Sequence, residues 1–550
     1  MKASDLMVKC LEAEGVELIF GVPGEENADF MMSLEKSESI RFVLTRHEQG
    51  AAFMAEIYGR LTGAPAACLG TLGPGATNLI TGVADANMDR APMLVLTGQG
   101  STKRLHKESH QIMDVVKMFE PVTKWATTII HADNIPEIVR KAVRIARSEK
   151  PSAVLVELPE NIAEDDTLAL PMMPIRFRRS PAHKEIIVDA AEKICVAKRP
   201  VILAGNGCVR KRSAGILRKL AALTGIGVLN TFMAKGALPS DSEQSLYTIG
   251  LGSKDIGTYA VDAADLVICI GFDMVEYHPS LWNATGEKKI IHIDFTPAEI
   301  DSDYHPELEL VGDVADTLEA LVLELKKTSE FAFDLSQQAL TRKEMAAELD
   351  LYRNDVTRGL IKPQKALADV QQVYGKYGLL LSDVGAHKMW IARHYHCDIP
   401  NGCLIPNGFC SMGFALPGAI AASLVEPGRK IIGIAGDAGF LMNVQEMETA
   451  TRLNSNITMM IWEDNAYGLI AWKQWAQFGR HTDLSFNNPD WSLLAASFSW
   501  DYKYVDDSRL LLHALLEAAE HNGPSLIVIP IDYNENQLLT HRLGEMNGQL

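Results

Sequence analysis

The sequence lacks any cysteine arrangement of the kind that binds zinc or builds a disulfide framework. Its eight cysteines are scattered over 550 residues, with no Cys-x-x-Cys pair and no Cys/His cluster. Cys68 and Cys269 lie in apolar runs, where the simplest interpretation is a buried free thiol in a reducing compartment. We therefore expect a cytoplasmic protein without structural zinc or disulfides.

An excess of positive charge and long apolar runs are also missing. The net charge of −18 argues against a nucleic-acid partner. No apolar run approaches the length of a membrane span, and the first residues have a helical pattern rather than that of a signal peptide. An apolar content of 47% with 22% charged residues is ordinary for a globular protein, and this length predicts about three to four domains.

Two acidic residues each follow a strand-like apolar run. Asp437 comes after residues 430–435, and Asp464 comes after residues 457–462, 27 positions later. The amphipathic stretch 443–453 predicts a helix between them, and a strand–helix–strand unit places two parallel strand ends side by side. Two carboxylates beside a helix N-terminus predict a site for Mg²⁺ carrying a phosphate or diphosphate. The alternative is a pair of ordinary turn acids, which the spacing and flanking strands disfavour.

Residues 1–165 predict the first of three α/β domains. Helical patterns alternate with apolar runs that end in turns, at 18–24, 41–48, 66–75, 92–98 and 152–157. Apolar strands separated by helices predict a parallel sheet covered on both faces. In such a sheet ligands gather at the carboxyl ends of the strands, where Pro23, Gly24, Glu48 and Gly73 fall.

The same pattern is repeated in residues 185–327 and 362–535. The apolar runs are 200–204, 227–230, 266–270 and 289–294 in the central domain, and 379–383, 431–435, 457–462 and 525–530 in the last. The predicted fold class is α/β, with three doubly wound parallel-sheet domains. Gly205-Asn206-Gly207 is a weak dinucleotide signal, because a lone Gly-x-Gly more often marks a turn after a strand.

Taken together, these segments resemble the thiamine-diphosphate (ThDP) enzymes of the acetohydroxyacid synthase and pyruvate oxidase group, over nearly the whole chain. The resemblance rests on residues 20–25, 46–48, 72–78, 409–417 and 436–438 with Asp464. It implies an aminopyrimidine-binding domain at 1–165, a Rossmann-like domain at 185–327 and a diphosphate- and Mg²⁺-binding domain at 362–535. The family has glycine where Ala438 stands, so Ala438 must adopt backbone angles open to a residue with a Cβ.

The middle of the chain is similar to the catabolic, flavin-independent acetolactate synthases, at residues 264–271, 275–283, 291–294 and 310–313. Flavin-binding relatives carry a Gly-Ala-Arg-Phe-like segment where this chain has Gly271-Phe272-Asp273, so the expected arginine is missing. The resemblance implies thiamine diphosphate and Mg²⁺ as cofactors and makes FAD an unexpected one.

The resemblance also implies a set of ligands for the metal and the coenzyme. The Mg²⁺ ligands are the side chains of Asp437 and Asp464 and the carbonyl of Ala466; Asp464 stands where many relatives have asparagine. The cofactor-binding residues are Pro23, Gly24, Gly73, His387, Cys410, Met412, Ala438 and Asn465.

Three of these residues are given specific roles. His387 contacts the diphosphate, the Cys410 carbonyl accepts a hydrogen bond from the 4′-amino group, and Met412 is a wedge that keeps the coenzyme bent. For His387 the alternative is a solvated histidine at a helix start, and for Met412 it is plain core packing.

For catalysis the resemblance implies Glu48, Gln111 and Lys473. Glu48 bonds N1′ of the aminopyrimidine and favours the imino tautomer, whose 4′-nitrogen takes the C2 proton of the thiazolium. Without the surrounding motifs, Glu48 would more simply be an exposed acid that starts the helix 49–61. Gln111 bonds the substrate carbonyl or carboxylate, or is an exposed loop amide. Lys473 attracts a pyruvate carboxylate, or turns outward and leaves that role to Trp472.

The implied reaction joins two pyruvates to 2-acetolactate with loss of CO₂, through an ylide and an enamine of the coenzyme. The chain is therefore predicted to be a transferase of the EC 2.2.1.6 type.

Relatives place the first domain of one subunit against the last domain of its partner, which implies a homodimer or homotetramer with shared sites. The alternatives are another ThDP-dependent 2-oxo-acid decarboxylase or carboligase, a flavin-dependent pyruvate oxidase, and a non-catalytic scaffold.

Overall fold

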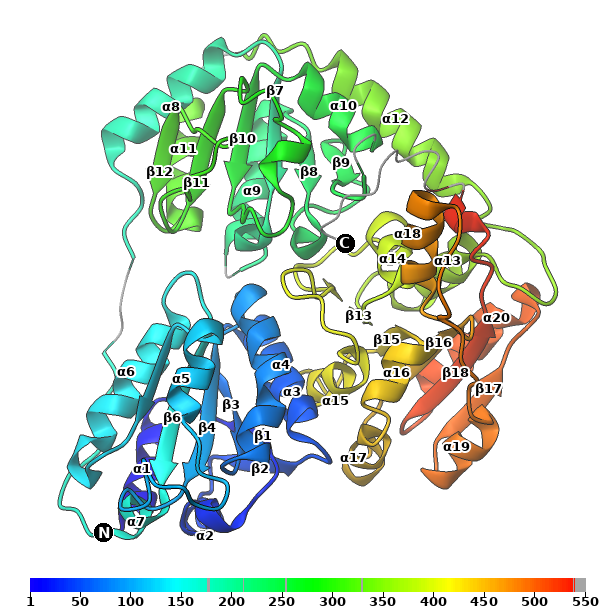
Figure 1. Cartoon of the computed structure of the whole chain (residues 1–550). Coiled ribbons are helices and arrows are strands. Elements are labelled where there is room, and N and C mark those ends of the chain that lie inside the picture. Colours follow the sequence, from blue (N-terminus) through cyan, green and yellow to red (C-terminus); the bar gives the residue numbers. More distant parts are fainter. Residues whose placement is uncertain (176–178, 211, 253–254, 328–329, 538, 540–550) are drawn as a thin grey trace. The chain divides into compact units, whose positions relative to one another are not determined.

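The computed structural model describes residues 1–175, 179–210, 212–252, 255–327, 330–537 and 539 (Figure 1). The chain forms two compact units, and each is described by itself. Unit 1 comprises residues 1–177, 408–428 and 441–455, and unit 2 comprises residues 178–407, 429–440 and 456–550. Unit 1 therefore contains the first sheet together with two segments from the region predicted as the third domain.

The sheet of unit 1 has six parallel strands in the order β2-β1-β3-β4-β6-β5. The strands are β1 (Leu18–Gly21), β2 (Arg41–Leu44), β3 (Ala66–Gly70), β4 (Met93–Gln99), β5 (Trp125–Thr128) and β6 (Ala153–Pro159). The helices are α1 (Ala3–Ala13), α2 (Ala28–Leu34), α3 (Glu48–Thr62), α4 (Pro74–Met88), α5 (Val115–Phe119), α6 (Ile135–Arg147) and α7 (Glu160–Glu164), with α15 (Ala415–Val425) and α17 (Glu446–Leu453) from the later segments.

The first sheet of unit 2 also has six parallel strands, in the order β12-β11-β10-β7-β8-β9. The strands are β7 (Pro200–Ala204), β8 (Val228–Asn230), β9 (Ser245–Thr248), β10 (Leu266–Ile270), β11 (Ile290–Asp294) and β12 (Leu308–Val311). The helices are α8 (Lys184–Val196), α9 (Ser213–Thr224), α10 (Ile256–Ala263), α11 (Val314–Leu325) and α12 (Ser336–Asp350).

The other sheet of unit 2 runs in the order β14-β13-β15-β16-β18-β17, again all parallel. The strands are β13 (Leu379–Ser382), β14 (Cys403–Leu404), β15 (Ile431–Gly436), β16 (Thr458–Glu463), β17 (Asp501–Tyr504) and β18 (Ser525–Pro530). The helices are α13 (Pro363–Tyr374), α14 (Ala386–His394), α18 (Gly468–Phe478), α19 (Trp491–Ser497) and α20 (Ser508–Glu520), and α16 (Asp437–Met442) starts in this unit.

Both faces of a central strand are buried, which explains the unbroken apolar runs. In β10, Ile268 and Ile270 belong to one apolar cluster, whereas Val267 and Cys269 belong to the cluster on the opposite face. Alternate residues of a strand point to opposite faces, so helices packed on both sides demand an apolar residue at every position. Three six-stranded parallel sheets with flanking helices confirm the predicted fold class.

The strands that the apolar runs did not reveal are edge strands. β5, β9, β12, β14 and β17 each lie at the end of a sheet and have two to four residues. Most of the residues in β5 and β17 are only half-buried. An edge strand is covered less completely, so its sequence need not be continuously apolar. In the described part of the chain, no helix combines the length and apolar character needed to cross a membrane.

Candidate active site

In unit 1, predicted residues follow the carboxyl ends of four neighbouring strands. Pro23 and Gly24 come after β1, Glu48 after β2, Gly73 after β3, and Gln111 lies in the loop after β4. Parallel strands end at the same edge of a sheet, so the fold carries these five residues to one rim. Such a rim is the usual place for a ligand in an α/β sheet.

Glu48 is the first residue of helix α3 and is 8% exposed. The side-chain amide of Asn78, on helix α4, donates a hydrogen bond of 3.0 Å to its Oε2 atom. A Cβ added at Gly75 would lie 3.4 Å from Oε1. Glu48 is therefore a buried carboxylate with one oxygen held by an amide, rather than the exposed helix-start acid that was the alternative.

The turn before Glu48 is fixed by a second buried carboxylate, that of Glu446 at the start of α17. Its Oε1 atom accepts hydrogen bonds from the backbone N–H groups of Arg46, at 3.1 Å, and His47, at 3.0 Å. Thr449 donates a third, of 2.6 Å, to Oε2. Burial raises the pKa of Glu446 to about 7. Glu446 thus anchors the backbone from which Glu48 emerges.

Gly73 and Gln111 lie against each other. A Cβ at Gly73 would be only 3.0 Å from the Cβ of Gln111, and both residues have positive φ, 55° and 56° respectively. A side chain at position 73 would therefore be strained and would collide with Gln111. The structure brings these two predicted residues together at the start of helix α4 (Pro74–Met88).

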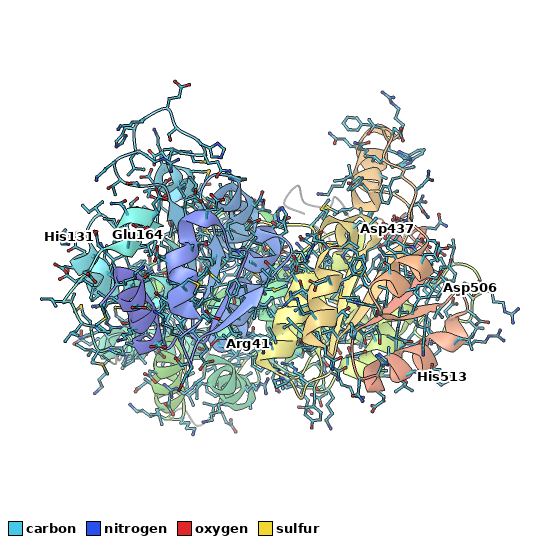
Figure 2. All side chains as sticks on the ribbon, turned by 90° about the horizontal axis from the view of Figure 1, so that it is seen from below. Arg41, His131, Glu164, Asp437, Asp506 and His513 are labelled. Carbon is cyan, nitrogen blue, oxygen red and sulfur yellow. The ribbon has the colours of Figure 1, made fainter. Side chains whose placement is uncertain are left out.

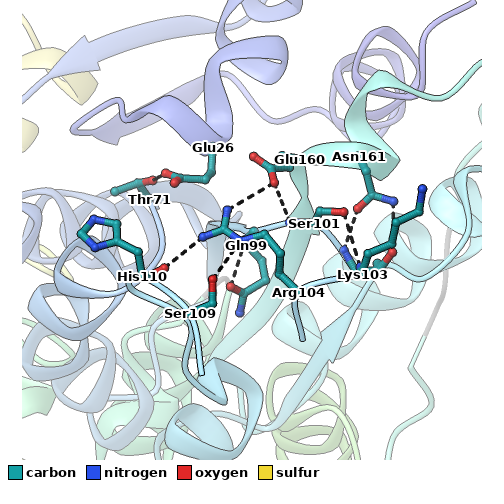
Figure 3. A network of polar contacts seen from close by, with 12 residues as sticks. Glu26, Thr71, Gln99, Ser101, Lys103, Arg104, Ser109, His110, Glu160 and Asn161 are labelled. Carbon is teal, nitrogen blue, oxygen red and sulfur yellow. Dashed lines mark hydrogen bonds and ion pairs between the residues drawn. The ribbon is translucent and has the colours of Figure 1, made fainter. Parts of the chain in front are cut away.

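The loop that carries Gln111 is held by Arg104 (Figure 3). The guanidinium group donates hydrogen bonds of 3.1 Å to Ser109 Oγ and 3.1 Å to the His110 carbonyl, and it lies 3.5 Å from the Glu160 carboxylate. Glu160 also accepts a hydrogen bond of 2.7 Å from the N–H of Ser101, at the start of the same loop. Arg104 and Glu160 therefore connect the start of the loop to the residues immediately before Gln111.

Cys410 and Met412 belong to a short segment that two buried aspartates of unit 1 hold. Asp89 accepts a hydrogen bond of 2.7 Å from the N–H of Gly408, and Asp85 accepts one of 3.1 Å from the N–H of Ser411. Cys410 lies between these anchors with a φ of 61°, a conformation uncommon for a non-glycine residue. Met412 is half-buried, so it is not simply a residue of the core.

In unit 2, Asp437 and Asp464 meet at the ends of two adjacent parallel strands. Gly436, the last residue of β15, pairs with Trp462 of β16. Asp437 is the first residue of helix α16 and is 1% exposed; it is labelled in Figure 2. Burial, and then the negative charge of Asp437, raise the pKa of Asp464 to about 7. The repulsion between two adjacent carboxylates is what a divalent cation would offset.

The oxygens of Asp437 accept several hydrogen bonds. Oδ1 accepts one of 2.9 Å from the N–H of Ala438, which lies within α16 and so has the right-handed conformation that alanine adopts without strain. Oδ2 accepts bonds from the N–H of Asn465, at 2.7 Å, and from the side-chain amide of Asn488, at 2.8 Å. Asn488 is a residue of this site that the sequence did not reveal.

His387 is buried at the start of helix α14, near the same rim. A Cβ at Gly436 would lie 3.6 Å from its ring, and its Nε2 atom has no hydrogen-bond partner among the described residues. Burial lowers the pKa of His387 to about 4, so the ring is neutral at pH 7. A buried, unpartnered imidazole nitrogen is a group awaiting a ligand, and a solvated histidine, the alternative interpretation, does not describe it.

Lys473 and Trp472 differ in burial on helix α18. Trp472 is 8% exposed and belongs to the apolar cluster of this sheet, whereas Lys473 is half-buried. Of the two, Lys473 is the side chain with more surface available to a solute.

Unit 1 also contains a buried group of three acids, which lies far along the sequence from the predicted metal ligands Asp437 and Asp464. Glu56, Asp85 and Asp89 have ligand atoms within 4.8 Å of one another. Arg60 lies 3.0 Å from Asp89 and 3.7 Å from Glu56, and backbone N–H groups bind Asp85 and Asp89. These partners make the cluster a structural element that supports the Cys410 segment.

The three sheets and the paired rim acids define a class of α/β enzyme, and comparisons with known proteins identify it. The N-terminal TPP (thiamine pyrophosphate, another name for ThDP) binding domain of thiamine pyrophosphate enzymes matches residues 1–118, the central domain matches residues 187–321, and the C-terminal TPP binding domain matches residues 383–529.

Three relatives are similar over almost their whole length. Acetolactate synthase of Bacillus subtilis (strain 168) is 34% identical, with 100% of this chain and 96% of that protein covered. The catabolic acetolactate synthase of Raoultella terrigena is 34% identical, with 98% and 97% covered. The probable acetolactate synthase large subunit of Methanocaldococcus jannaschii is 33% identical, with 97% and 92% covered.

The chain therefore belongs to the acetolactate synthase family of thiamine pyrophosphate enzymes. This confirms the family and the enzyme class predicted from the sequence, with thiamine diphosphate and Mg²⁺ as the cofactors. The residues described above fit that group, because the carboxylate pair suits a divalent cation and the unpartnered His387 nitrogen suits a diphosphate oxygen.

Proposed function

We propose that the chain is an acetolactate synthase that condenses two pyruvates to 2-acetolactate and CO₂. The observation that carries the proposal is the presence, in one chain of this family, of a buried Glu48 held by Asn78 and a carboxylate pair, Asp437 and Asp464, at adjacent strand ends. Bound thiamine diphosphate supplies the carbanion and the electron sink for decarboxylation. One proton is taken up for each acetolactate formed from two pyruvate anions.

The residues of unit 1 are proposed to activate the coenzyme. With the coenzyme bound, Glu48 would hold a proton toward N1′ of the aminopyrimidine through the oxygen that Asn78 does not hold. The Cys410 carbonyl would accept a hydrogen bond from the 4′-amino group, and Met412 would pack against the coenzyme. Pro23, Gly24 and Gly73 border this rim with backbone atoms.

The residues of unit 2 are proposed to hold the diphosphate and its metal. Asp437, Asp464 and the Ala466 carbonyl bind Mg²⁺, and His387 donates to a phosphoryl oxygen from its unpartnered ring nitrogen. Ala438 and Asn465 supply backbone groups beside the diphosphate. These assignments use the burial and strand-end positions described above.

Gln111 and Lys473 are proposed to bind pyruvate. Gln111 offers an amide to a carbonyl or carboxylate from the loop that Arg104 holds. Lys473 offers a positive charge to the carboxylate of the second pyruvate, with Trp472 committed to the apolar core. A pocket that excludes water would favour loss of CO₂ from this charged substrate.

We further propose that the enzyme works without flavin, as the catabolic form does. The Gly205-Asn206-Gly207 turn is occupied by the chain itself: the carboxylate of Glu276 accepts a hydrogen bond of 2.8 Å from the N–H of Asn206. Gly207 and Gly271 are in backbone contact, since a Cβ at Gly207 would lie 2.6 Å from the Gly271 Cα. An anionic dinucleotide would have to displace a carboxylate from this turn.

The active unit is proposed to be a homodimer or homotetramer in the cytoplasm, with Glu48 of one subunit serving the same site as Asp437 of the partner subunit. Six of the eight cysteines are buried free thiols, which suits a reducing compartment.

Product analysis tests the proposed reaction. Purified protein with pyruvate, thiamine diphosphate and Mg²⁺ should form acetolactate, which yields acetoin on acidification, and Glu48→Gln should abolish it. Acetaldehyde as the main product would favour a simple decarboxylase, and a yellow protein absorbing near roughly 450 nm would favour a flavin oxidase. Competition with 2-oxobutyrate would then define the acceptor.

A further inference from the structure

The polypeptide segment 484–491 lies along the turn that follows β16. Ser485 pairs with Ala466 in an antiparallel bridge. The N–H of Tyr467 donates a hydrogen bond of 3.1 Å to the Leu484 carbonyl, and the N–H of Phe486 donates one of 3.0 Å to the Asn465 carbonyl. The residues on both sides of Ala466 are thereby fixed to this segment.

The pairing determines the direction of the Ala466 backbone groups. In an antiparallel pair, successive residues present their N–H and C=O groups to opposite sides. Since Asn465 and Tyr467 use theirs toward segment 484–491, the N–H and C=O of Ala466 face the other way. The N–H of Ala466 does hydrogen-bond the Asp464 carboxyl, which places the Ala466 carbonyl on the side of the acid pair.

Asn488, in the middle of that segment, contacts both strand ends of the acid pair. Its Nδ2 atom lies 2.8 Å from Asp437 Oδ2, 3.1 Å from Asn465 Oδ1 and 3.2 Å from Glu463 Oε1. All three neighbours are acceptor oxygens, so the amide nitrogen must be the atom that faces them. Asp437 follows β15, whereas Glu463 is the last residue of β16 and Asn465 lies just beyond Asp464.

Glu463 is held in place by a second donor from the same segment. The indole Nε1–H of Trp491 donates a hydrogen bond of 2.7 Å to the Glu463 carboxylate. Without such donors Glu463 would add an uncompensated negative charge beside Asp437 and Asp464. The hydrogen bonds from Asn488 and Trp491 stabilise the negative charge of Glu463 and fix the position of its carboxylate.

The two carboxylate oxygens of Asp437 differ in the number of hydrogen bonds that they accept. Oδ2 accepts from Asn488, from the N–H of Asn465 and from the N–H of Asp464, at 3.3 Å, so its lone pairs are used. Oδ1 accepts one backbone hydrogen bond, from the N–H of Ala438. Oδ1 is therefore the oxygen with a lone pair left for a cation.

We propose that Asn488 is a positioning residue of the cation site: it ties Asp437 to the turn that carries Asp464 and Ala466, so that carboxylate oxygens and a backbone carbonyl converge on one ion. The proposal rests on the proposed function, because it supposes that these residues bind Mg²⁺. Groups that orient metal ligands by hydrogen bonds typically change metal affinity about 10- to 100-fold when removed.

The test is titration of the full-length protein with Mg²⁺ at saturating thiamine diphosphate, read by calorimetry and, with Mn²⁺ in place of Mg²⁺, by electron paramagnetic resonance. Asn488→Ala should raise the half-saturating cation concentration about tenfold or more. Asn488→Asp, which has the same shape but places a carboxylate against Asp437, should raise it further. The matched control is Asn487→Ala, since Asn487 is exposed and adjacent.

The pattern of results separates a positioning role from a general structural one. For Asn488→Ala we expect kcat to recover toward the wild-type value at high Mg²⁺, with a melting temperature without cation close to that of Asn487→Ala. Unchanged cation affinity in both Asn488 variants would overturn the proposal. If Asn488→Ala does not fold, Asn488→Ser carries the same expectation. A wild-type protein that binds no cation would instead refute the proposed function.

Discussion

The side-chain amide of Asn78 donates a hydrogen bond of 3.0 Å to Oε2 of Glu48. This contact joins α4, near its start, to the first residue of α3, and the two helices follow β3 and β2, the strands on either side of β1. A donor at Oε2 orients the carboxylate and leaves Oε1 as the oxygen for the coenzyme. The contact gives Asn78 a role that its position in the sequence alone did not suggest.

Asn78→Asp should lower kcat by about 10- to 100-fold, because a second carboxylate would replace the donor and repel Glu48. Asn78→Ala should have a smaller effect, since it removes the donor without adding charge. Steady-state kinetics with pyruvate measures both. Thr77→Ala is the control, because Thr77 is exposed on the same helix turn. Wild-type kcat in Asn78→Asp would contradict this role.

Co-expression of two inactive variants tests whether a site is shared between subunits. Glu48→Gln and Asp437→Asn should each be inactive alone. If Glu48 and the partner's Asp437 serve one site, a mixed dimer has one intact site of two, and random pairing should restore about a quarter of the wild-type activity. Differently tagged chains allow the mixed dimer to be purified and assayed. No recovery in the purified mixed dimer would place both residues of a site on one chain.

Arg104→Ala should raise the KM for pyruvate about tenfold while leaving the affinity for thiamine diphosphate unchanged. The guanidinium group bonds Ser109 and the His110 carbonyl and lies near Glu160, so its loss frees the loop before Gln111 (Figure 3). Initial-rate kinetics and calorimetry with the coenzyme measure the two quantities separately. Lys103→Ala is the neighbouring control, and an equal effect in that variant would argue against a specific role of Arg104.

Glu446 should make stability depend on pH. Burial raises the pKa of its carboxyl from 4.5 to about 7, so the folded chain keeps a proton that the unfolded chain releases between these values. The unfolding free energy should therefore fall as pH rises through this window and then level off. The fall from this group should be on the order of 3 kcal/mol.

Glu446→Gln cannot titrate and should lack this component of the pH dependence. Urea unfolding at pH 5 and pH 7.5 gives the change in unfolding free energy between the two pH values for each protein. The difference between the wild type and Glu446→Gln is the contribution of this carboxyl. Glu448→Gln, two residues further along α17, serves as the control. Equal pH dependence in the wild type and Glu446→Gln would show that this carboxyl does not retain its proton in the folded chain.

Removing the divalent cation should weaken the coenzyme rather than unfold the protein. With EDTA, we expect the affinity for thiamine diphosphate to fall sharply, because Asp437 and Asp464 would then repel the diphosphate. Asp464→Asn should lose less affinity without the cation than the wild type does. Calorimetric titration with the coenzyme, with and without Mg²⁺, compares the two. Coenzyme binding that is independent of the cation would contradict the assignment of the pair.

The interior strands were predictable because burial on both faces leaves an unmistakable pattern. In β10 every position from Leu266 to Ile270 is apolar, and the structure buries each one. The edge strand β5, Trp125–Thr128, has four half-buried residues and no such pattern, so only the sheet itself reveals it. A continuous apolar run indicates that a strand is buried on both faces, and edge strands are buried less completely.

The sequence by itself determined the three parallel sheets, the family and the strand-end positions of Glu48, Asp437 and Asp464. These follow from local order along the chain, because a strand, a turn and a helix place their own residues without help from distant ones. Only the tertiary structure decided what holds those residues. Asn78, Glu446 and Asn488 reach Glu48, its preceding turn and Asp437 across 30, about 400 and 51 positions of sequence, respectively. Contacts of that kind depend on how elements pack together, and no local pattern of residues encodes them.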